Sequence, residues 1–151
     1  MENRFDIDIV RVSDIPAILR LLDRAGLIHA DLAPDHFRHF LAARDWRGEV
    51  VGSAGLEIHG PSGLLRSLAV VPDFRGEGLG RRLLERTESM ATRIGIRHLY
   101  LLTTTAPVFF RKHGYRDMDR GSVPTEIAST AEFAGLCPVS AVCLFKVLDA
   151  R

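Results

Sequence analysis

Three glycines at alternate positions mark the segment of this 151-residue chain that is best suited to binding chemistry. They lie in the run Arg75-Gly76-Glu77-Gly78-Leu79-Gly80-Arg81. Glycine lets the backbone adopt positive φ, and it brings N–H groups close to a ligand without a Cβ in the way. A helix that starts here adds unpaired N–H donors and the positive end of its dipole. The run therefore predicts an anion site, most naturally for phosphate.

The segments on either side supply the elements that such a site needs. Leu64–Val70 reads as an apolar strand, and after the loop apolar residues recur at helical spacing from Leu83 to Ile94, with Gly95 as the stop. The glycine spacing differs from the dinucleotide-binding fingerprint, and no Gly-Lys-Ser/Thr of a P-loop follows. Strand, glycine loop and helix together favour a phosphate-bearing ligand of another class.

At these residues the chain closely resembles the GNAT superfamily of acyl-CoA-dependent N-acetyltransferases. The family signature is an Arg/Gln-x-x-Gly-x-Gly/Ala loop, matched by Arg75, Gly78 and Gly80, after a strand such as Ser67–Val70. The resemblance implies acetyl-CoA as co-substrate and no metal. Backbone N–H groups of the loop would bind the CoA pyrophosphate, and the strand would pair with pantetheine. The implied cofactor-binding residues are Leu68, Ala69, Val70, Arg75, Gly76, Glu77, Gly78, Leu79, Gly80 and Arg81.

Acetyl transfer to an amine also needs a group that accepts the amine proton and a donor toward the thioester oxygen. Glu57 and His59 alternate on one face of a strand, and either could take the proton through water, although a solvated face explains them equally well. Arg66 shares strand parity with Leu68, and it could bind a substrate carboxylate or form a structural salt bridge. We take Glu57 and Arg66 as the catalytic candidates. An N–H of Leu68 or Val70 is the expected oxyanion donor.

One position departs from the family pattern. Many members carry Asn-x-x-Ala-x-x-Leu-Tyr-x-x-x-Gly-Phe, with the tyrosine as general acid, and here Phe110 stands at the tyrosine position and Thr103 at the asparagine. Phenylalanine has no proton to donate. Water or another group would have to protonate the CoA thiolate, or the thiolate leaves unassisted. Tyr115 is expected to pack in the core.

The resemblance narrows toward domains that acetylate the α-amine of glutamate-like amino acids. The C-terminal segment is similar to a group of arsenic-resistance N-acetyltransferases, through a Pro-x-x-Ile helix at Pro124 and Ile127 and the Phe133–Val142 run. This implies an amino-acid acceptor, including an arsenic-containing glutamate analogue such as arsinothricin. Relatives are often dimers, so a homodimer is compatible with the resemblance.

Two other functional classes stay open at this point. The missing tyrosine at Phe110 is compatible with a non-catalytic acyl-CoA sensor. Cys137 and Cys143 are soft ligands that could bind trivalent arsenic directly. Unpaired cysteines are mostly buried, and this explains Cys143 better than Cys137.

Composition bounds the remaining possibilities. An apolar fraction of 46% and a charged fraction of 26% predict a globular protein, and 151 residues predict a single domain over residues 1–151. A formal charge of +1 gives no field that would draw nucleic acid or a membrane surface. The charged start MENRFDIDIV lacks the apolar core of a signal peptide, so the cytoplasm is the expected compartment.

The order of elements predicts an α/β fold in the α+β sense, a central mixed sheet with helices on both faces, as the resemblance also implies. Expected strands cover residues 5–10, 40–43, 49–59, 64–70, 97–103, 115–118 and 138–147. Expected helices begin at Ser13, follow the glycine loop, and cover residues 106–113 and 124–134, with a short one possible between 26 and 37.

Overall fold

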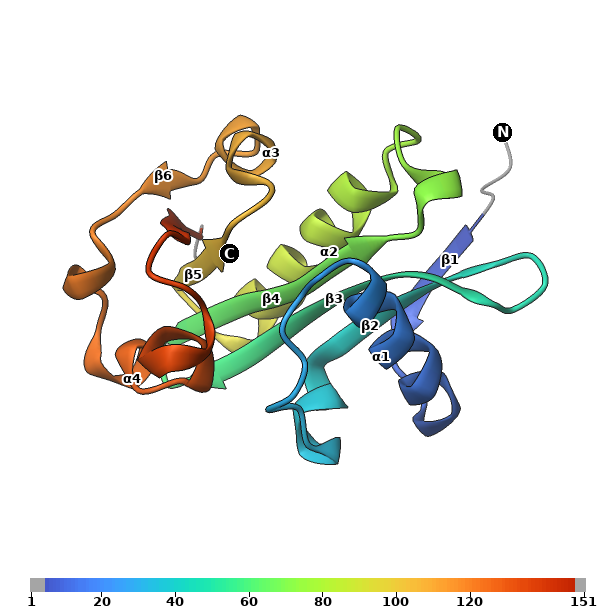
Figure 1. Ribbon diagram of the computed structural model, residues 1–151, viewed down its shortest axis with the longest axis horizontal. Helices are drawn as coiled ribbons and strands as arrows, with labels where there is room; N and C mark the ends of the chain where they lie inside the picture. The colour runs from blue at the N-terminus through green and yellow to red at the C-terminus, as the bar shows by residue number, and fades with distance from the viewer. Residues whose placement is uncertain (1–4, 149–151) are drawn as a thin grey trace. The chain divides into compact units, whose positions relative to one another are not determined.

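The computed structural model describes residues 5–148 (Figure 1). The strands are β1 (Phe5–Ile9), β2 (Phe40–Asp45), β3 (Val50–His59), β4 (Ser62–Val70), β5 (His98–Thr103), β6 (Arg116–Asp117) and β7 (Val142–Val147). The α-helices are α1 (Ile15–Arg24), α2 (Leu79–Ile94), α3 (Pro107–Lys112) and α4 (Thr125–Ala128). Short 3₁₀ helices lie at η1 (Val12–Asp14), η2 (Pro34–His39), η3 (Pro72–Phe74) and η4 (Arg120–Ser122), and η5 (Glu132–Leu136) is a short π-helix.

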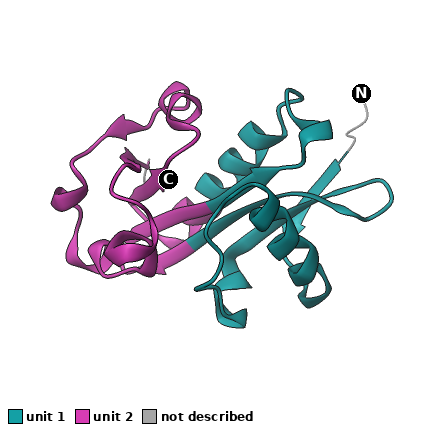
Figure 2. Ribbon diagram, in the orientation of Figure 1, with its two compact units in different colours: residues 1–56, 67–89 teal, residues 57–66, 90–151 magenta. Residues whose placement is uncertain are grey.

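The strands form a seven-stranded mixed sheet in the order β1-β2-β3-β4-β5-β7-β6. The β1–β2, β2–β3, β5–β7 and β6–β7 pairs are antiparallel, and the β4–β5 pair is parallel. The chain forms two compact units, residues 1–56 with 67–89 and residues 57–66 with 90–151 (Figure 2). The mixed sheet agrees with the expected fold class. A single domain over residues 1–151 stays a prediction.

In the first unit, helices cover both faces of the strands. Helix α1 buries Ile18 and Leu22 against Phe40 and Ala42 of β2. Gly52 of β3 pairs with Ala43, whose side chain points to the opposite face from that of Ala42. A Cβ on Gly52 would lie 3.0 Å from Leu83 and 3.3 Å from Leu79, so α2 packs on this opposite face (Figure 1). The missing side chain at residue 52 allows α2 to approach the strand closely.

On the face of the sheet that α1 covers, Gly55 likewise leaves space for close packing, here of an aromatic ring. It pairs with Phe40 across the β2–β3 ladder, and a Cβ built on it would lie 2.3 Å from the Phe40 ring. No side chain fits there while the ring keeps its place. Phe40 is fully buried and meets Phe37 edge to face at 4.9 Å, so the ring is fixed from both sides.

A buried ion pair joins the start of α1 to β2. Arg44 Nε donates to Asp14 Oδ1 at 3.2 Å and Arg44 Nη2 donates to Oδ2, which also accepts the N–H of Arg11 at 2.8 Å. Arg44 and Asp14 are each more than nine-tenths buried. Burial raises the pKa of the Asp14 carboxyl, but the Arg44 and Arg11 hydrogen bonds outweigh burial, and its pKa lies below the ordinary value.

Ser67 interrupts the regular backbone of β4. Its φ of 60° is the only positive value at a non-glycine residue among the residues described, and this left-handed conformation costs about 1–2 kcal/mol. The buried Ser53 hydroxyl donates to the Ser67 carbonyl at 2.7 Å, which satisfies that carbonyl at the irregularity. Strict side-chain alternation therefore does not continue through residue 67.

In the second unit, β5 lies between β4 and β7 and its residues are largely buried. It pairs in parallel with Ser62–Leu64 and antiparallel with β7 along its whole length. One face packs a cluster made of Leu64, Tyr100, Val123, Ile127, Phe133 and Cys143. This cluster joins the strands to the C-terminal turns of the chain.

Several element boundaries differ from the sequence expectations. The helix expected over residues 124–134 is broken, because the Ser129 hydroxyl donates to the Thr125 carbonyl at 2.7 Å and the Thr130 hydroxyl to the Ile127 carbonyl at 2.8 Å. Such back-bonding competes with continuation of a helix. The strand expected at 115–118 is only two residues long, β7 begins at Val142 rather than at 138, and β4 begins at Ser62 within the expected turn. The segment 26–37 contains no α-helix, and the η2 turn begins at its end.

Candidate functional site

The glycine loop connects β4 to α2 in the first unit. Gly76 and Gly78 have φ values of 81° and 82°, which L residues rarely adopt. A Cβ on Gly76 would meet no atom within 4 Å, and one on Gly78 would meet only the Arg81 guanidinium, at 3.8 Å. Packing therefore does not require glycine at either position. Backbone direction requires it, and the space beside the loop is open.

The start of α2 presents N–H donors to this space. The N–H of Arg82 bonds the Gly78 carbonyl at 3.1 Å, which is the first helical turn closing on the loop. The N–H groups just before it have no carbonyl acceptor within the helix, and the dipole places positive potential at this end. Two contacts anchor the start of the loop. Phe74, just before it, is buried, and Arg75 Nε donates to the Val70 carbonyl at 3.1 Å. A fixed loop with open donors is suited to a phosphate.

The three strand residues expected to contact the cofactor lie at the end of β4, directly before this loop. Ala69 is buried in the α1 core, while Leu68 and Val70 are half-buried. Beyond them the Val71 N–H bonds the Val51 carbonyl at 2.9 Å, which holds the strand end on β3. Thus Leu68–Val70 end β4, and Arg75–Arg81, which form the loop and the first turn of α2, follow after the η3 turn in the same unit. Their contacts with pantetheine and pyrophosphate stay a prediction.

The two catalytic candidates lie in the second unit, in direct contact. Arg66 Nη1 lies 2.7 Å from Glu57 Oε2, and Arg66 Nε lies 3.3 Å from Glu132 Oε2. The Arg66 side chain has no exposed surface, and Glu57 and Glu132 are 12% and 7% exposed. On the other side of Glu57, His59 Nε2 lies 3.1 Å from Oε1, with the imidazole 31% exposed. A chain of ionisable groups thus runs from buried Glu132 to partly exposed His59.

This geometry favours the structural salt bridge for Arg66. A guanidinium enclosed by two carboxylates is already neutralised, so a substrate carboxylate would have to displace one of them. Sequence reasoning missed Glu132. It lies in a segment expected to be an ordinary helix, and no local pattern links it to a distant strand. The only available signal was an arginine inside an otherwise apolar strand, which implies an acidic partner somewhere in the fold.

A family model for the acetyltransferase (GNAT) domain matches residues 35–117. The chain belongs to the GNAT family. An uncharacterized N-acetyltransferase of Chlorobaculum tepidum is 32% identical over 94 residues, which is 62% of this chain and 59% of that protein. An amino-acid acetyltransferase of Mycobacterium tuberculosis is 30% identical over 125 residues, covering 78% of this chain and 71% of that protein. The chain therefore spans less than two thirds of the Chlorobaculum relative.

Solved GNAT structures share the fold over nearly the whole chain. The N-acetylglutamate synthase of Neisseria gonorrhoeae, complexed with coenzyme A and N-acetyl-glutamate, superposes with a TM-score of 0.83 at 24% identity, covering 99% of this chain and 36% of that one. A Mycobacterium tuberculosis protein in complex with CoA and NLQ gives a TM-score of 0.82 at 25% identity, over 95% of this chain and 99% of that one. These superpositions confirm the GNAT fold that the resemblance implied.

At the position of the usual GNAT tyrosine, Phe110 is a core residue. It is buried, and its ring meets Phe109 at 5.2 Å and Tyr115 at 5.6 Å, both edge to face. Tyr115 is itself buried, as expected. The Thr103 hydroxyl accepts the N–H of Ala106 at 3.0 Å, so this threonine shapes the turn before α3. Phe110 therefore has no proton to donate and lies in the core.

Both cysteine thiols of this GNAT chain are poorly ionised at neutral pH. Burial raises the pKa of Cys137 to about 11, with Glu132 nearby adding to the effect, and burial raises the pKa of Cys143 to about 11. Cys143 lies inside the Tyr100–Phe133 core cluster. Soft metal and metalloid ions bind the thiolate form, which is scarce here at neutral pH. The raised pKa values therefore disfavour direct arsenic binding by the two cysteines.

No helix among residues 5–148 is both long and apolar enough to cross a membrane. A cytoplasmic location stays a prediction.

Proposed function

We propose that this chain is an acetyl-CoA-dependent N-acetyltransferase that acts on the amine of a small amino-acid-like acceptor. The observation that carries the proposal is the β4–α2 loop, where Gly76 and Gly78 take positive φ beside open space and α2 begins at Leu79. Membership of the GNAT family supports the reaction type. Relatives named amino-acid acetyltransferases support an amino-acid acceptor.

In this proposal the first unit binds the thioester. Backbone N–H groups from Gly76 to Arg81 would hold the CoA pyrophosphate, with Arg75 fixed through the Val70 carbonyl. The end of β4 would pair with pantetheine. The N–H of Leu68 or Val70 would donate to the thioester oxygen as negative charge develops on it, which lowers the barrier only if the donor is already in place.

The transfer itself balances without a redox partner. The acceptor nitrogen attacks the thioester carbonyl carbon and forms the C–N bond, which gives a tetrahedral intermediate. The C–S bond then breaks, CoA leaves as its thiolate, and the nitrogen loses a proton. Water protonates the thiolate in this scheme, because Phe110 has no proton to give.

We propose that Glu57 and His59 accept the proton, at the more exposed end of the chain of ionisable groups that begins at Glu132 in the second unit. Because Arg66 Nη1 lies 2.7 Å from Glu57 Oε2, the carboxylate is held with its other oxygen toward the imidazole. His59 is the more exposed of the two groups, and it is therefore the one that water can reach. In this scheme Arg66 is a positioning residue for Glu57.

A glutamate-like compound is our proposed acceptor. The Neisseria enzyme that shares this fold is named N-acetylglutamate synthase, and relatives named amino-acid acetyltransferases match most of this chain. Arsinothricin, an arsenic-containing glutamate analogue, is the narrower proposal. It rests only on the resemblance of the Phe133–Val142 segment to arsenic-resistance acetyltransferases. Acetylation would remove the positive charge of its amine.

The test is a thiol-release assay with acetyl-CoA against glutamate, phosphinothricin, arsinothricin, neutral amino acids, polyamines and lysine peptides. Selective turnover of a glutamate-like compound is the expected result. Gly78→Glu should abolish CoA binding, because it places a carboxylate where phosphate would sit. Gly78→Ala brings the same backbone strain without charge, and Gly121→Glu brings the charge at a glycine of the second unit. Gly78→Ala should weaken binding less, and Gly121→Glu should leave binding unchanged.

Three outcomes would overturn parts of this proposal. Absence of any acetyl-CoA binding by the wild-type chain would end the enzyme reading. Unchanged CoA binding in Gly78→Glu would show that the loop is not the phosphate site. CoA binding without turnover of any amine on the panel would favour a non-catalytic acyl-CoA sensor.

A further inference from the structure

A serine hydroxyl lies fully buried on the face of the sheet that α1 covers. Ser53 pairs with Ala42 across the β2–β3 ladder, and directly opposed residues place their side chains on the same face. Ala42 belongs to the apolar cluster under α1, so Ser53 shares that environment, and it has no exposed surface. A hydroxyl in such a place is costly unless it is hydrogen-bonded. Its acceptor is the Ser67 carbonyl, at 2.7 Å.

This hydrogen bond fixes one peptide plane of β4. The Ser67 carbonyl and the Leu68 N–H belong to the same peptide unit, which is trans. In a planar trans peptide the C=O and the N–H point in opposite directions. A hydroxyl that holds the carbonyl therefore also sets the direction of the N–H on the other side of the plane.

The Leu68 N–H points to the edge of β4 that faces away from β3. Successive N–H groups of a strand alternate between its two edges, and the Val71 N–H bonds the Val51 carbonyl of β3 at 2.9 Å. The N–H groups of Val70 and Leu68 therefore lie on the other edge. On that edge, ladder pairing with β5 is confined to Ser62–Leu64 among the residues described, so it ends before Leu68.

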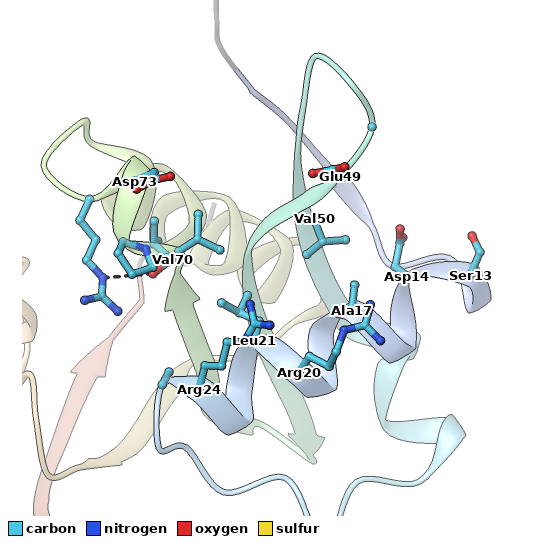
Figure 3. A pocket seen from close by; sticks show the side chains of 15 residues that line it. Ser13, Asp14, Ala17, Arg20, Leu21, Arg24, Glu49, Val50, Val70 and Asp73 are labelled. Atoms are coloured by element: carbon cyan, nitrogen blue, oxygen red, sulfur yellow. Dashed lines mark hydrogen bonds between the residues drawn. The ribbon is translucent and has the colours of Figure 1, made fainter.

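The backbone at Ser67 needs external support to keep this orientation. Its φ of 60° lies in the left-handed region, and such strain persists only where the surrounding contacts over-determine it. The hydrogen bond from Ser53 is one such contact. The other end of the segment is also held, because the Val70 carbonyl accepts Arg75 Nε at 3.1 Å where the strand end lines a pocket beside α1 (Figure 3). Leu68 thus lies between two fixed points.

We propose that Ser53 is a positioning residue for acetyl transfer, which holds the Leu68 N–H in the direction that the thioester oxygen requires. The inference rests on the proposed function, in which an N–H of Leu68 or Val70 donates to that oxygen. A donor lowers the barrier most when it needs no reorientation as negative charge develops. Within residues 5–148, Leu68 is the candidate whose peptide carbonyl is held by a buried side chain.

The test uses acetyl-CoA whose thioester carbonyl carries carbon-13, bound to the full chain without an acceptor. Isotope-edited infrared spectroscopy measures the stretching frequency of this carbonyl, which a hydrogen bond to its oxygen lowers. The wild type should therefore give a lower frequency than free acetyl-CoA, and in Ser53→Ala the frequency should return toward the free value. The dissociation constant should change by less than about twofold. With glutamate as acceptor, kcat should fall about 10-fold with little change in KM, because misorienting a donor costs less than removing it.

Thr87→Val is the matched control. Thr87 is also fully buried in the first unit, and its hydroxyl donates to the Leu83 carbonyl at 2.8 Å within α2. The control thus removes a buried hydroxyl-to-carbonyl bond of the same kind, and it should leave the carbonyl frequency and kcat at their wild-type values. Ser53→Cys carries a thiol, which is a weaker donor, and should be intermediate. It takes the place of Ser53→Ala if that variant does not fold.

Two results would overturn the role of Ser53 alone. One is a Ser53→Ala protein that matches Thr87→Val in carbonyl frequency and in kcat. The other is a lowered kcat with an unchanged carbonyl frequency, which would mean that the hydroxyl acts elsewhere. An unshifted frequency in the wild type would overturn the inference together with the strand N–H as oxyanion donor. If the wild type does not bind acetyl-CoA, the proposed function itself fails. The infrared measurement needs no acceptor, so it decides the inference even if glutamate is not the substrate.

Discussion

Arg66 Nη1 lies 2.7 Å from Glu57 Oε2, inside a cluster where Glu132 holds the same guanidinium from its other side. One cation is thus shared by two carboxylates that are each almost fully removed from water. A buried charge of this kind is retained only while its partners are present, because an unpaired ion in the interior is costly. The contact ties β3 and β4 to the η5 turn within the second unit.

Replacement of Arg66 should show that the stability of the fold depends on this cation. Arg66→Met is expected to lower the free energy of unfolding by about 3–5 kcal/mol, because it leaves two buried carboxylates without a cation. The deficit should shrink below about pH 5, since the pKa values of unpaired buried carboxyls are raised and protonation then stabilises the fold. Urea unfolding across pH measures both effects.

The matched control for Arg66 neutralises its partners. Glu57→Gln/Arg66→Met/Glu132→Gln should recover part of the lost stability at pH 7. A deficit that is independent of pH and insensitive to the glutamine changes would mean that Arg66 contributes through packing alone. If Arg66 instead bound an acceptor carboxylate, Arg66→Lys would raise the acceptor KM with little change in stability.

The Asp14–Arg44 pair predicts acid sensitivity of the first unit. The pKa of Asp14 is below its ordinary value, so its ionised form stabilises the fold above that value and the contribution is lost as pH falls through the folded-state pKa. Asp14→Asn should therefore be destabilised at pH 7 by about 3 kcal/mol or more, with a difference from wild type that narrows between about pH 5 and pH 2.

The measurement is chemical unfolding of the wild type and of Asp14→Asn at several pH values. Asp73→Asn is a suitable control, because Asp73 is exposed and lacks a partner among residues 5–148. A constant difference between wild type and Asp14→Asn over this range would contradict the assignment.

Restoring a tyrosine at position 110 should not restore a general acid. Phe110 is packed against two aromatic rings, so the new hydroxyl would be buried and would cost about 1–3 kcal/mol unless it finds a partner. We expect Phe110→Tyr to be less stable by thermal unfolding and no faster in acetyl transfer. A rate gain with a new alkaline limb in the pH profile would instead show that the hydroxyl reaches the leaving thiolate.

The cysteines should be slow nucleophiles. With pKa values of about 11, the thiolate fractions of Cys137 and Cys143 at neutral pH are on the order of 100-fold below that of an ordinary exposed thiol. Reaction with a thiol-disulfide reagent should be slow in the folded protein and fast in urea. Arsenite binding should be weak and unchanged in Cys137→Ser/Cys143→Ser, whereas tight binding that the double change removes would revive the metalloid reading.

Local patterns were enough to predict the glycine loop and most strands, because turn glycines, strand periodicity and helix spacing act over a few residues. The loop's positive φ values at Gly76 and Gly78 follow from glycine itself. Long-range partners could not be predicted in this way. Glu132 meets Arg66 only after the intervening strands and turns have folded, and no spacing in the sequence encodes that meeting.

The parity argument along β4 shows a second limit. It placed Arg66 on one face with Leu68, as an uninterrupted strand requires, but Ser67 takes φ 60° between them. Serine carries no signal for a left-handed conformation, unlike glycine or asparagine. The break at Ser129 and Thr130 escaped for a similar reason, since either residue is tolerated in a helix when its hydroxyl points elsewhere.

The contact between Gly55 and Phe40 constrains how this sequence can change. Any side chain at residue 55 would collide with the ring, so a substitution there is acceptable only together with a smaller residue at 40. The loss at 40 would in turn leave a cavity under α1, which a larger residue at 55 could refill. Across proteins of this family, a larger residue at 55 should therefore occur together with a smaller residue at 40. In a library randomised at both positions, folded variants should be those in which a large residue at one position accompanies a small residue at the other.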